Sequence, residues 1–240
     1  MAKSFPYLHL LMFFIIVLLS LVMPCYGADP SPLQDYCIAD LSSDIYLNGY
    51  PCKNPNNVTV DDFFYDGFIT DTTAFNIDRW KAAAAHVDFF PAVNTLGVTM
   101  IQIQLLKGGV VGPHTHPRAS EMLLLMEGKV IAGFITTDNV LFYKTMTPKM
   151  LVVIPQAFVH FVYNVGEGAA LLYASYNSQQ PGTHYLSHAL FNSTPTVPDD
   201  VLSRSFRVND SIIELLKSSL SVPLYPDIMS STSSGSVRLK

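Results

Sequence analysis

Three side chains that commonly bind metals stand within eight residues of one another near the middle of this 240-residue chain. They are His114, His116 and Glu121, in the run Pro113-His-Thr-His-Pro-Arg-Ala-Ser-Glu121. Pro117 excludes a continuous helix through this run, because proline lacks an amide hydrogen and clashes with the preceding turn. On a strand, residues two positions apart point to the same face, so the two histidines can converge on one ion. Two imidazoles and a carboxylate suit a divalent transition metal, and they need at least one further ligand.

The missing ligand is expected from another histidine. His160 lies in the segment Phe158–Tyr163, whose other residues are apolar. A lone histidine in such a strand is ordinarily a hydrogen-bonded core residue, but beside an incomplete ligand set it is the natural fourth ligand. His86, His184 and His188 show no acidic or histidine partner at ligand spacing, and we expect them to be surface or hydrogen-bonded residues.

The first 27 residues have the organisation of a secretory signal peptide. An early lysine is followed by an apolar stretch from Leu8 to Met23 and by a small-residue cleavage site ending at Gly27. A signal anchor is the alternative, but the apolar core is shorter than the ~20 residues of a spanning helix. Cleavage leaves 213 residues, enough for one large domain, and changes the formal net charge from −5 to −6. A mildly acidic chain without a basic stripe is not expected to bind nucleic acid, and the mature form is not expected to bind a membrane.

The cysteines agree with secretion. Cys25 leaves with the signal peptide, so Cys37 and Cys52 remain. An even pair in a secreted chain is expected to form a disulfide, and a role as thiolate ligands is disfavoured because the pair lies outside the histidine cluster.

Three sequons predict N-glycosylation, at Asn57, Asn192 and Asn209. Asn57 is the strongest candidate. Pro195 closely follows the second sequon, and the third stands at an expected helix start.

Short β segments dominate from about Asn94 to Asn177. Ile101, Ile103 and Leu105 alternate with glutamines, which indicates a strand with one buried face. The runs 122–126 and 151–154 are apolar throughout, so we expect both strands to be covered on both sides. Further strands are expected over 130–135, 140–143, 158–163 and 169–176. Many short strands at a spacing of about 8–12 residues predict an all-β sandwich or barrel.

After Pro198 the hydrophobic period becomes helical. Asn209 is expected to cap a helix, with Val208 packing against Ile213 across the cap. The apolar stripe Ile212–Leu220 either packs on the chain's own barrel or is covered by a partner subunit. The predicted division is a signal peptide (1–27), a disulfide-pinned arm (28–57), a barrel (58–198), a helical oligomerisation segment (199–222) and a flexible tail (223–240).

The ligand-bearing segments resemble the two cupin motifs. Gly108, His114, His116, Glu121 and Gly128 fit the first motif at every position, and Pro155, His160 and Asn164 fit the second. Further stretches resemble the germins and germin-like proteins of plants: 32–37, 94–98, 113–121 and 177–182. The similarity extends over roughly residues 29 to 220.

This resemblance implies an all-β cupin jelly-roll barrel with C-terminal α-helices, secreted as a glycoprotein to the apoplast. It implies one manganese ion held by His114, His116, Glu121 and His160, with water in the open positions. It also implies a homo-hexamer, a trimer of dimers joined through C-terminal helices, which would make the stripe Ile212–Leu220 a subunit interface. The ligands alone do not select manganese, because imidazoles also accept iron, copper and zinc.

The chain departs from the family pattern at several positions, four of which concern the turns and the surroundings of the ligands. Two glycines of the second motif are Lys149 and Ala157 here, so the turns around that strand are expected to be remodelled. Germins that oxidise oxalate have two asparagines near the metal, and an ungapped count from His114 places Ile101 and Val111 there. Burying a dianion without hydrogen-bond donors costs several kcal/mol, so oxalate oxidase activity is not expected.

Two classes of function follow from the resemblance. One is superoxide dismutase activity with a role in defence, because this substrate is small and needs no asparagine pair. The other is a non-enzymatic protein of the cell-wall matrix, a nutrient reservoir or a small-ligand binder. In that case five apolar residues could line a ligand pocket, although such residues are more often barrel core: Ile101, Val111, Met122, Leu124 and Met126.

Overall fold

The computed structural model describes residues 11–15, 34–45, 47–68 and 74–221. Most of the predicted signal peptide and the whole of the predicted tail from 223 to 240 lie outside the described residues. Among the residues that are described, no helix is long and apolar enough to span a membrane.

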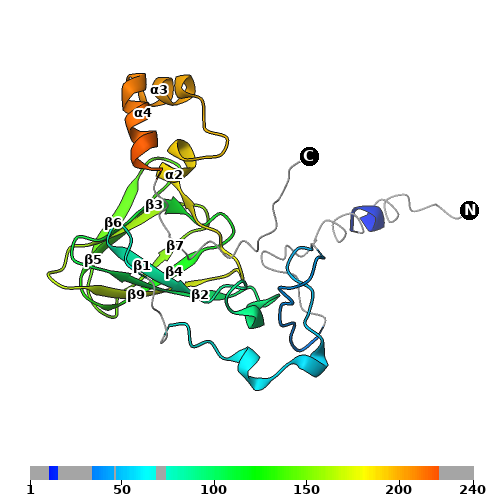
Figure 1. The fold of residues 1–240 in the computed structure, drawn as a ribbon. Helices are drawn as coiled ribbons and strands as arrows, with labels where there is room; N and C mark the ends of the chain where they lie inside the picture. The colour runs from blue at the N-terminus through cyan, green and yellow to red at the C-terminus, as the bar shows by residue number, and fades with distance from the viewer. Residues whose placement is uncertain (1–10, 16–33, 46, 69–73, 222–240) are drawn as a thin grey trace, which may run out of the picture.

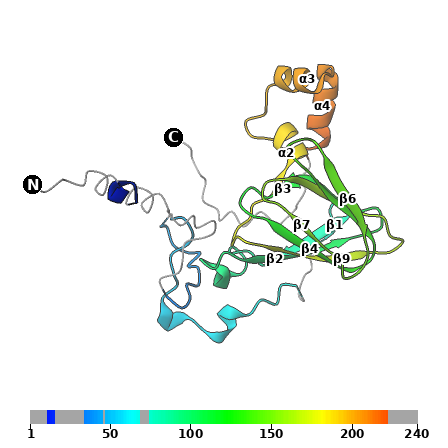
Figure 2. The same ribbon diagram turned by 180° about the vertical axis from the view of Figure 1, so that it is seen from behind.

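Two antiparallel five-stranded sheets form the barrel (Figures 1 and 2). The first sheet has the order β1 (Trp80–Ala84), β2 (Thr99–Leu105), β9 (Ala170–Tyr176), β4 (Glu121–Glu127) and β7 (Leu151–Ile154). The second has the order β10 (His184–Tyr185), β3 (Val110–Thr115), β8 (Val159–Asn164), β5 (Val130–Ile135) and β6 (Leu141–Met146). The predicted all-β cupin architecture with C-terminal helices is therefore confirmed.

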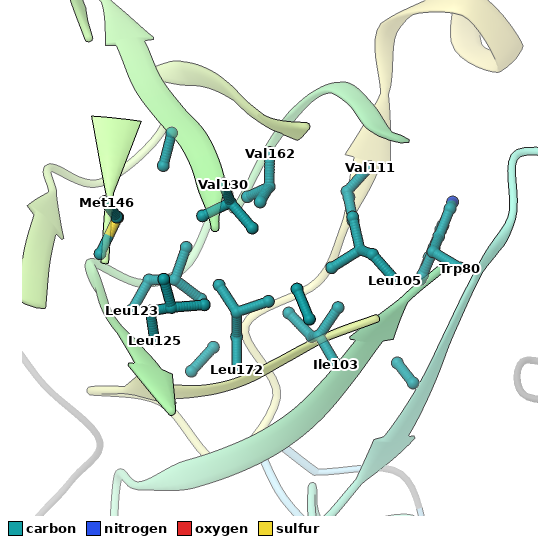
Figure 3. Close-up of a cluster of buried hydrophobic side chains, with 14 of the residues drawn as sticks. Trp80, Ile103, Leu105, Val111, Leu123, Leu125, Val130, Met146, Val162 and Leu172 are labelled. Carbon is teal, nitrogen blue, oxygen red and sulfur yellow. The ribbon is translucent and has the colours of Figure 1, made fainter. Parts of the chain in front are cut away.

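Alternating side chains fill the space between the sheets. Leu123 and Leu125 of β4 and Leu172 of β9 are fully buried, and Figure 3 shows them opposite Val130 and Val162 of the second sheet. Strand β9 alternates strictly between buried and half-buried positions, as a period of two requires. This apolar packing holds in place the strands that carry the predicted ligands.

The outer face of the first sheet corrects one prediction. Met122 and Met126 of β4 are 47% and 44% exposed, and Leu151 and Val153 of β7 are 53% and 55% exposed. The described part of the chain leaves these side chains uncovered, so within a single chain β4 and β7 are buried on one face only. Gln102, by contrast, is buried, because its side chain donates a hydrogen bond to the hydroxyl of Tyr173 (2.7 Å).

Three helices follow the barrel: α2 (Leu186–Phe191), α3 (Asp199–Phe206) and α4 (Asp210–Ser219). Helices α3 and α4 project together from one end of the barrel, away from the N-terminal arm (Figures 1 and 2). Asn209 is the N-cap residue of α4, although its side chain makes no capping hydrogen bond. The apolar stripe divides: Ile213 packs with Phe191 and Leu202 of the other helices, whereas Ile212 and Leu215 are 44% and 63% exposed.

Two 3-10 helices precede the first barrel strand, η1 (Pro55–Asn57) and η2 (Val60–Phe63), and a third, η3 (Pro91–Val93), lies between β1 and β2. The arm before η2 contains Cys37 and Cys52. Cys37 and Cys52 form a disulfide that closes it, with their Cα atoms 4.8 Å apart. The predicted disulfide is therefore present.

The turns around β7 adopt the left-handed conformation that glycine favours, although Lys149 and Ala157 stand at the two expected glycine positions. Lys149 and Ala157 adopt positive φ angles of 75° and 65°. Tertiary hydrogen bonds hold both backbones: the Lys149 amide donates to Leu125 O (2.7 Å) and the Ala157 amide donates to His116 O (3.1 Å). Long-range contacts thus hold both residues in a conformation that glycine favours, at the cost of local strain.

Replacing Lys149 by glycine should stabilise the protein. A left-handed conformation costs an L-residue about 1–2 kcal/mol, and glycine avoids this cost. In the opposite direction, glycine makes the unfolded chain more flexible, which lowers the stability of the folded state by about 0.4–1 kcal/mol. We expect Lys149→Gly to raise the free energy of unfolding by about 0.5–1 kcal/mol in denaturant titration. Lys129→Gly is the matched control, because Lys129 is exposed and has no positive φ, and it should lower stability. Loss of stability in both variants would contradict this account of the turn.

Candidate metal centre

Four side chains from three strand regions meet inside the barrel. His114 lies on β3, His116 directly follows β3, Glu121 begins β4 and His160 lies on β8. One ligand atom from each lies within 4.8 Å of the others. All four residues are at most 5% exposed. The structure therefore brings together the complete set of ligands that the sequence predicts.

Strand pairing explains the convergence. His114 pairs directly with His160 across β3 and β8, after a register shift between Val111 and His114. The imidazole ring of His114 lies 4.0 Å from that of His160 and 5.1 Å from that of His116, between centroids. Glu121 enters from the other sheet, so both sheets are needed to form the site.

Backbone carbonyls orient all three imidazoles. Nδ1 of His114 lies 2.8 Å from Gly112 O, that of His160 lies 2.9 Å from Phe158 O, and that of His116 lies 2.6 Å from Gly182 O. A carbonyl accepts, so each Nδ1 carries a proton, and each Nε2 is the nitrogen left to bind a metal. This arrangement is typical of histidines that bind metals.

The buried ligand atoms fit a cation at their centre. His116 Nε2, His160 Nε2 and Glu121 Oε2 are inaccessible to solvent and make no well-aligned hydrogen bond. The carboxylate oxygen lies 3.4 Å and 2.9 Å from the two nitrogens. Neighbouring ligands of an octahedral ion with bonds of about 2.1 Å lie about 3 Å apart, so these atoms stand at coordination spacing.

The protonation states also suit a metal. Burial, with the neighbouring His160 and His116, lowers the pKa of His114 to about 3. Burial alone would raise the pKa of the Glu121 carboxyl, but the close approach of His116 and His160 outweighs it and holds that pKa well below its ordinary range. At neutral pH the site therefore offers a neutral imidazole at His114 and an ionised carboxylate at Glu121.

A cavity of about 50 Å³ adjoins the ligands. Ile101 and Val111, the positions counted as the asparagines of oxalate-oxidising germins, both line it. Its other walls are largely apolar and include Trp80, Ala82, Ile103 and Val162. These two apolar side chains, Ile101 and Val111, therefore form part of the surface that a bound substrate would meet.

Two tyrosines that the sequence did not suggest also line this cavity. Tyr185 stacks on the His114 ring at 5.2 Å, and Tyr176 meets the His116 ring edge-on at 4.7 Å. Burial, together with the Glu121 charge, raises the pKa of Tyr176 well above its ordinary value. Both tyrosines are remote from the motifs in sequence. Only the alternation of side chains along β9, which places Tyr176 on the inward face, could have indicated this residue.

The remaining residues considered from the sequence do not join the four metal ligands. Met122 and Met126 point outward, so the proposed five-residue pocket with Ile101 and Val111 does not form, and these two methionines are not barrel core either. His86 has an acidic neighbour that the sequence interpretation overlooked, since its Nδ1 lies 3.4 Å from Asp88 Oδ2.

The sequon asparagines are all exposed: Asn57, Asn192 and Asn209. Exposure is compatible with glycosylation at each of them.

Comparison with known proteins places this geometry in a family. The Cupin family matches residues 70–214. Germin-like protein 1-1 of Oryza sativa subsp. japonica is 46% identical over 201 residues, which cover 84% of this chain and 92% of that protein. The chain belongs to the germin-like proteins of the cupin family.

Solved structures agree with this assignment. An oxalate oxidase structure superposes with a TM-score of 0.78 and 34% identity, covering 81% of this chain and 98% of that one. Peruvianin-I, described as a cysteine peptidase from Thevetia peruviana latex, is 46% identical with a TM-score of 0.65, covering 66% of this chain and 98% of that one. This germin-like cupin thus carries a metal-binding group of three histidines and one glutamate.

Proposed function

We propose that this germin-like protein binds manganese and dismutes superoxide in the extracellular space. The observation that carries the proposal is the small apolar cavity beside three histidines and one glutamate. Such a cavity admits a diatomic anion and offers little to a larger polar substrate. The reaction converts two superoxide ions and two protons into dioxygen and hydrogen peroxide, and peroxide released at the cell wall supports a role in defence.

Manganese is favoured by the mixed ligand set. Carboxylate and water ligands suit manganese, whereas imidazoles alone accept zinc, copper and iron as readily. When bound, the ion would supply one-electron redox chemistry by alternating between two oxidation states. The chain's own contribution is to orient the imidazoles through the Nδ1 contacts and to exclude bulk water with apolar walls.

Oxalate is disfavoured as a substrate, although the solved structure described above is that of an oxalate oxidase. Ile101 and Val111 place apolar side chains where a dianion would need hydrogen-bond donors. Two potential donors beside the ligands are thereby lost, and burying charge with too few partners costs several kcal/mol.

A thiol-dependent peptidase activity, suggested by the description of Peruvianin-I, is also disfavoured. Cys37 and Cys52 are joined in the disulfide, and Cys25, the third cysteine in the sequence, falls in the predicted signal peptide outside the described residues.

A non-enzymatic role is the second candidate, and one observation favours it. A groove of about 660 Å³ runs over the outer face of the first sheet, lined by aromatic and methionine side chains that include Tyr65, Phe68, Phe90, Met100 and Met122. It would suit an apolar small ligand, as expected of an extracellular matrix, storage or ligand-binding protein.

Secretion, glycosylation and assembly complete the proposal. The signal-like residues 1–27, the disulfide and the exposed sequons support a glycoprotein of the plant apoplast in contact with the cell-wall matrix. The exposed Ile212 and Leu215 of α4, with the exposed apolar face of β4 and β7, support a homo-hexamer in which partner subunits cover them. In this proposal the boundaries between the segments of the chain fall at residues 27, 57, 198 and 222.

Parallel assays on one preparation test the proposed function. Protein secreted by plant cells is analysed for metal content and by electron paramagnetic resonance, and then given superoxide and oxalate separately. We expect about one manganese per chain, turnover of superoxide and no turnover of oxalate. Oxalate oxidation would overturn the specificity argument. A metal-dependent rise in melting temperature without turnover of either substrate would favour the non-enzymatic role.

A further inference from the structure

His116 depends on a distant loop for its orientation. His114 and His160 take their Nδ1 acceptors from the carbonyl two residues earlier, at Gly112 and Phe158. The acceptor for His116, Gly182 O, is 66 residues away in sequence, at 2.6 Å from Nδ1. The position of the loop formed by residues 177–183 therefore decides whether His116 presents Nε2 to a metal.

Several contacts fix this loop on the barrel. Arg118 Nε donates to Gln180 O (2.8 Å), and the Arg118 amide donates to Pro181 O (3.2 Å). Gly182 has a φ of +67°, and a Cβ there would lie 2.7 Å from the Arg118 guanidinium. Glycine at this position therefore adopts the positive φ without strain and leaves room for the Arg118 guanidinium beside the loop.

The loop is also tied to the disulfide-bonded arm through Asp88. One carboxylate oxygen of Asp88 accepts from Gln180 Nε2 (2.5 Å), and the other accepts from the hydroxyl of Tyr50 (2.5 Å). The bond to Asp88 raises the pKa of Tyr50 to about 12, so the hydroxyl remains a donor. Asp88 thus joins the arm to the loop that holds His116.

Tyr50 is itself fixed to the disulfide. Its amide donates to Asn94 Oδ1 (3.2 Å), and Asn94 Nδ2 donates to Tyr50 O (2.8 Å). Asn94 is fully buried, and its Nδ2 lies 3.3 Å from Cys37 Sγ. A continuous set of contacts therefore runs from the Cys37–Cys52 disulfide to the imidazole of His116.

We propose that the disulfide-bonded arm is a positioning element of the metal centre, holding Gly182 O on His116 through Tyr50, Asp88 and Gln180. The inference requires that the four ligands bind a metal, and it is independent of superoxide turnover. Opening the disulfide, or removing the arm's hydrogen bond to Asp88, loosens the loop and lowers metal affinity. The reason is that removing the hydrogen-bond partner of a metal-bound histidine commonly weakens metal binding about 10–100-fold.

Tyr50→Phe is the sharpest test, because it removes one hydroxyl and keeps the ring. The full-length protein is stripped of metal and titrated with Mn²⁺, and the melting temperature of the metal-free protein is measured alongside. We expect the dissociation constant to rise about tenfold, with a changed electron paramagnetic resonance spectrum of bound Mn²⁺. Asp88→Asn should act in the same direction.

Tyr143→Phe and Asp138→Asn are the matched controls. Tyr143 lies on β6 and Asp138 lies in the turn between β5 and β6, and both side chains are exposed. Both substitutions should leave the dissociation constant unchanged. A lower melting temperature for Tyr50→Phe with unchanged affinity and spectrum would show that the arm serves only stability, and would overturn the proposal.

The coupling must also operate in reverse. If the intact arm strengthens Mn²⁺ binding tenfold, bound Mn²⁺ must favour the oxidised arm over the reduced arm tenfold. For this two-electron couple, that factor lowers the midpoint potential of Cys37–Cys52 by about 30 mV. Glutathione buffers of defined ratio, with and without saturating Mn²⁺, measure the shift. A midpoint that Mn²⁺ does not move would overturn the coupling even if the protein binds Mn²⁺ tightly.

Discussion

Glu121→Gln should lower the affinity for Mn²⁺ more than about 100-fold. This loss is larger than the loss that follows when a hydrogen-bond partner of a ligand is removed. Glu121 is the one anionic member of the ligand set, and its Oε2 stands between two imidazole nitrogens. Glutamine keeps the shape but removes the charge that a hard cation requires. Three imidazoles remain, and they still suit Zn²⁺. The loss should therefore be smaller for Zn²⁺ than for Mn²⁺, as calorimetric titration with each ion would reveal.

Glu127→Gln is the control for this substitution. Glu127 ends the same strand, β4, but its side chain is exposed. The control should bind Mn²⁺ as the parent protein does. Equal loss of Mn²⁺ and Zn²⁺ affinity in Glu121→Gln would mean that the carboxylate supports the site as a whole and does not select the ion.

The metal-free protein should lose several kcal/mol of stability on acidification. His114 has an ordinary pKa of 6.5 when unfolded and a pKa of about 3 when folded. Between these values the unfolded chain binds a proton that the folded chain refuses, so the free energy of unfolding falls as pH decreases from about 6.5 to about 3. A pKa difference of this size corresponds to on the order of 5 kcal/mol. The lowered pKa of Glu121 adds a loss in the same direction at the acidic end.

Denaturant titrations at a series of pH values measure this effect. His114→Gln should flatten the pH dependence of the metal-free protein, because glutamine does not titrate. The exposed His184 provides the control, and His184→Gln should preserve the slope. A metal-free protein whose stability is constant between pH 6.5 and pH 4 would show that His114 is not held neutral by its surroundings.

The parts of the site that could be predicted from sequence are those with local signals. His114 and His116 are two residues apart on an extended segment, and Glu121 follows five residues later. His160 was found because it interrupts an apolar strand. Each of these signals depends only on neighbours along the chain.

The parts that were missed depend on tertiary contacts. Strand β1 was overlooked because its Lys-Ala-Ala-Ala sequence has a high intrinsic helix propensity, which pairing with β2 overrides. Lys149 and Ala157 keep left-handed turns because distant carbonyls hold their amides. Gly182 became visible as a partner of His116 only when the fold brought its loop to the ligands.

Superoxide dismutation measured against manganese content tests the central claim most directly. Metal-free protein is loaded with increasing amounts of Mn²⁺, and the dismutation rate is recorded at each loading. We predict a rate that rises in proportion to bound manganese and saturates at one ion per chain, with Zn²⁺-loaded protein inactive. A rate no faster than that of the same protein with alanine at His114, His116, Glu121 and His160 would contradict the account.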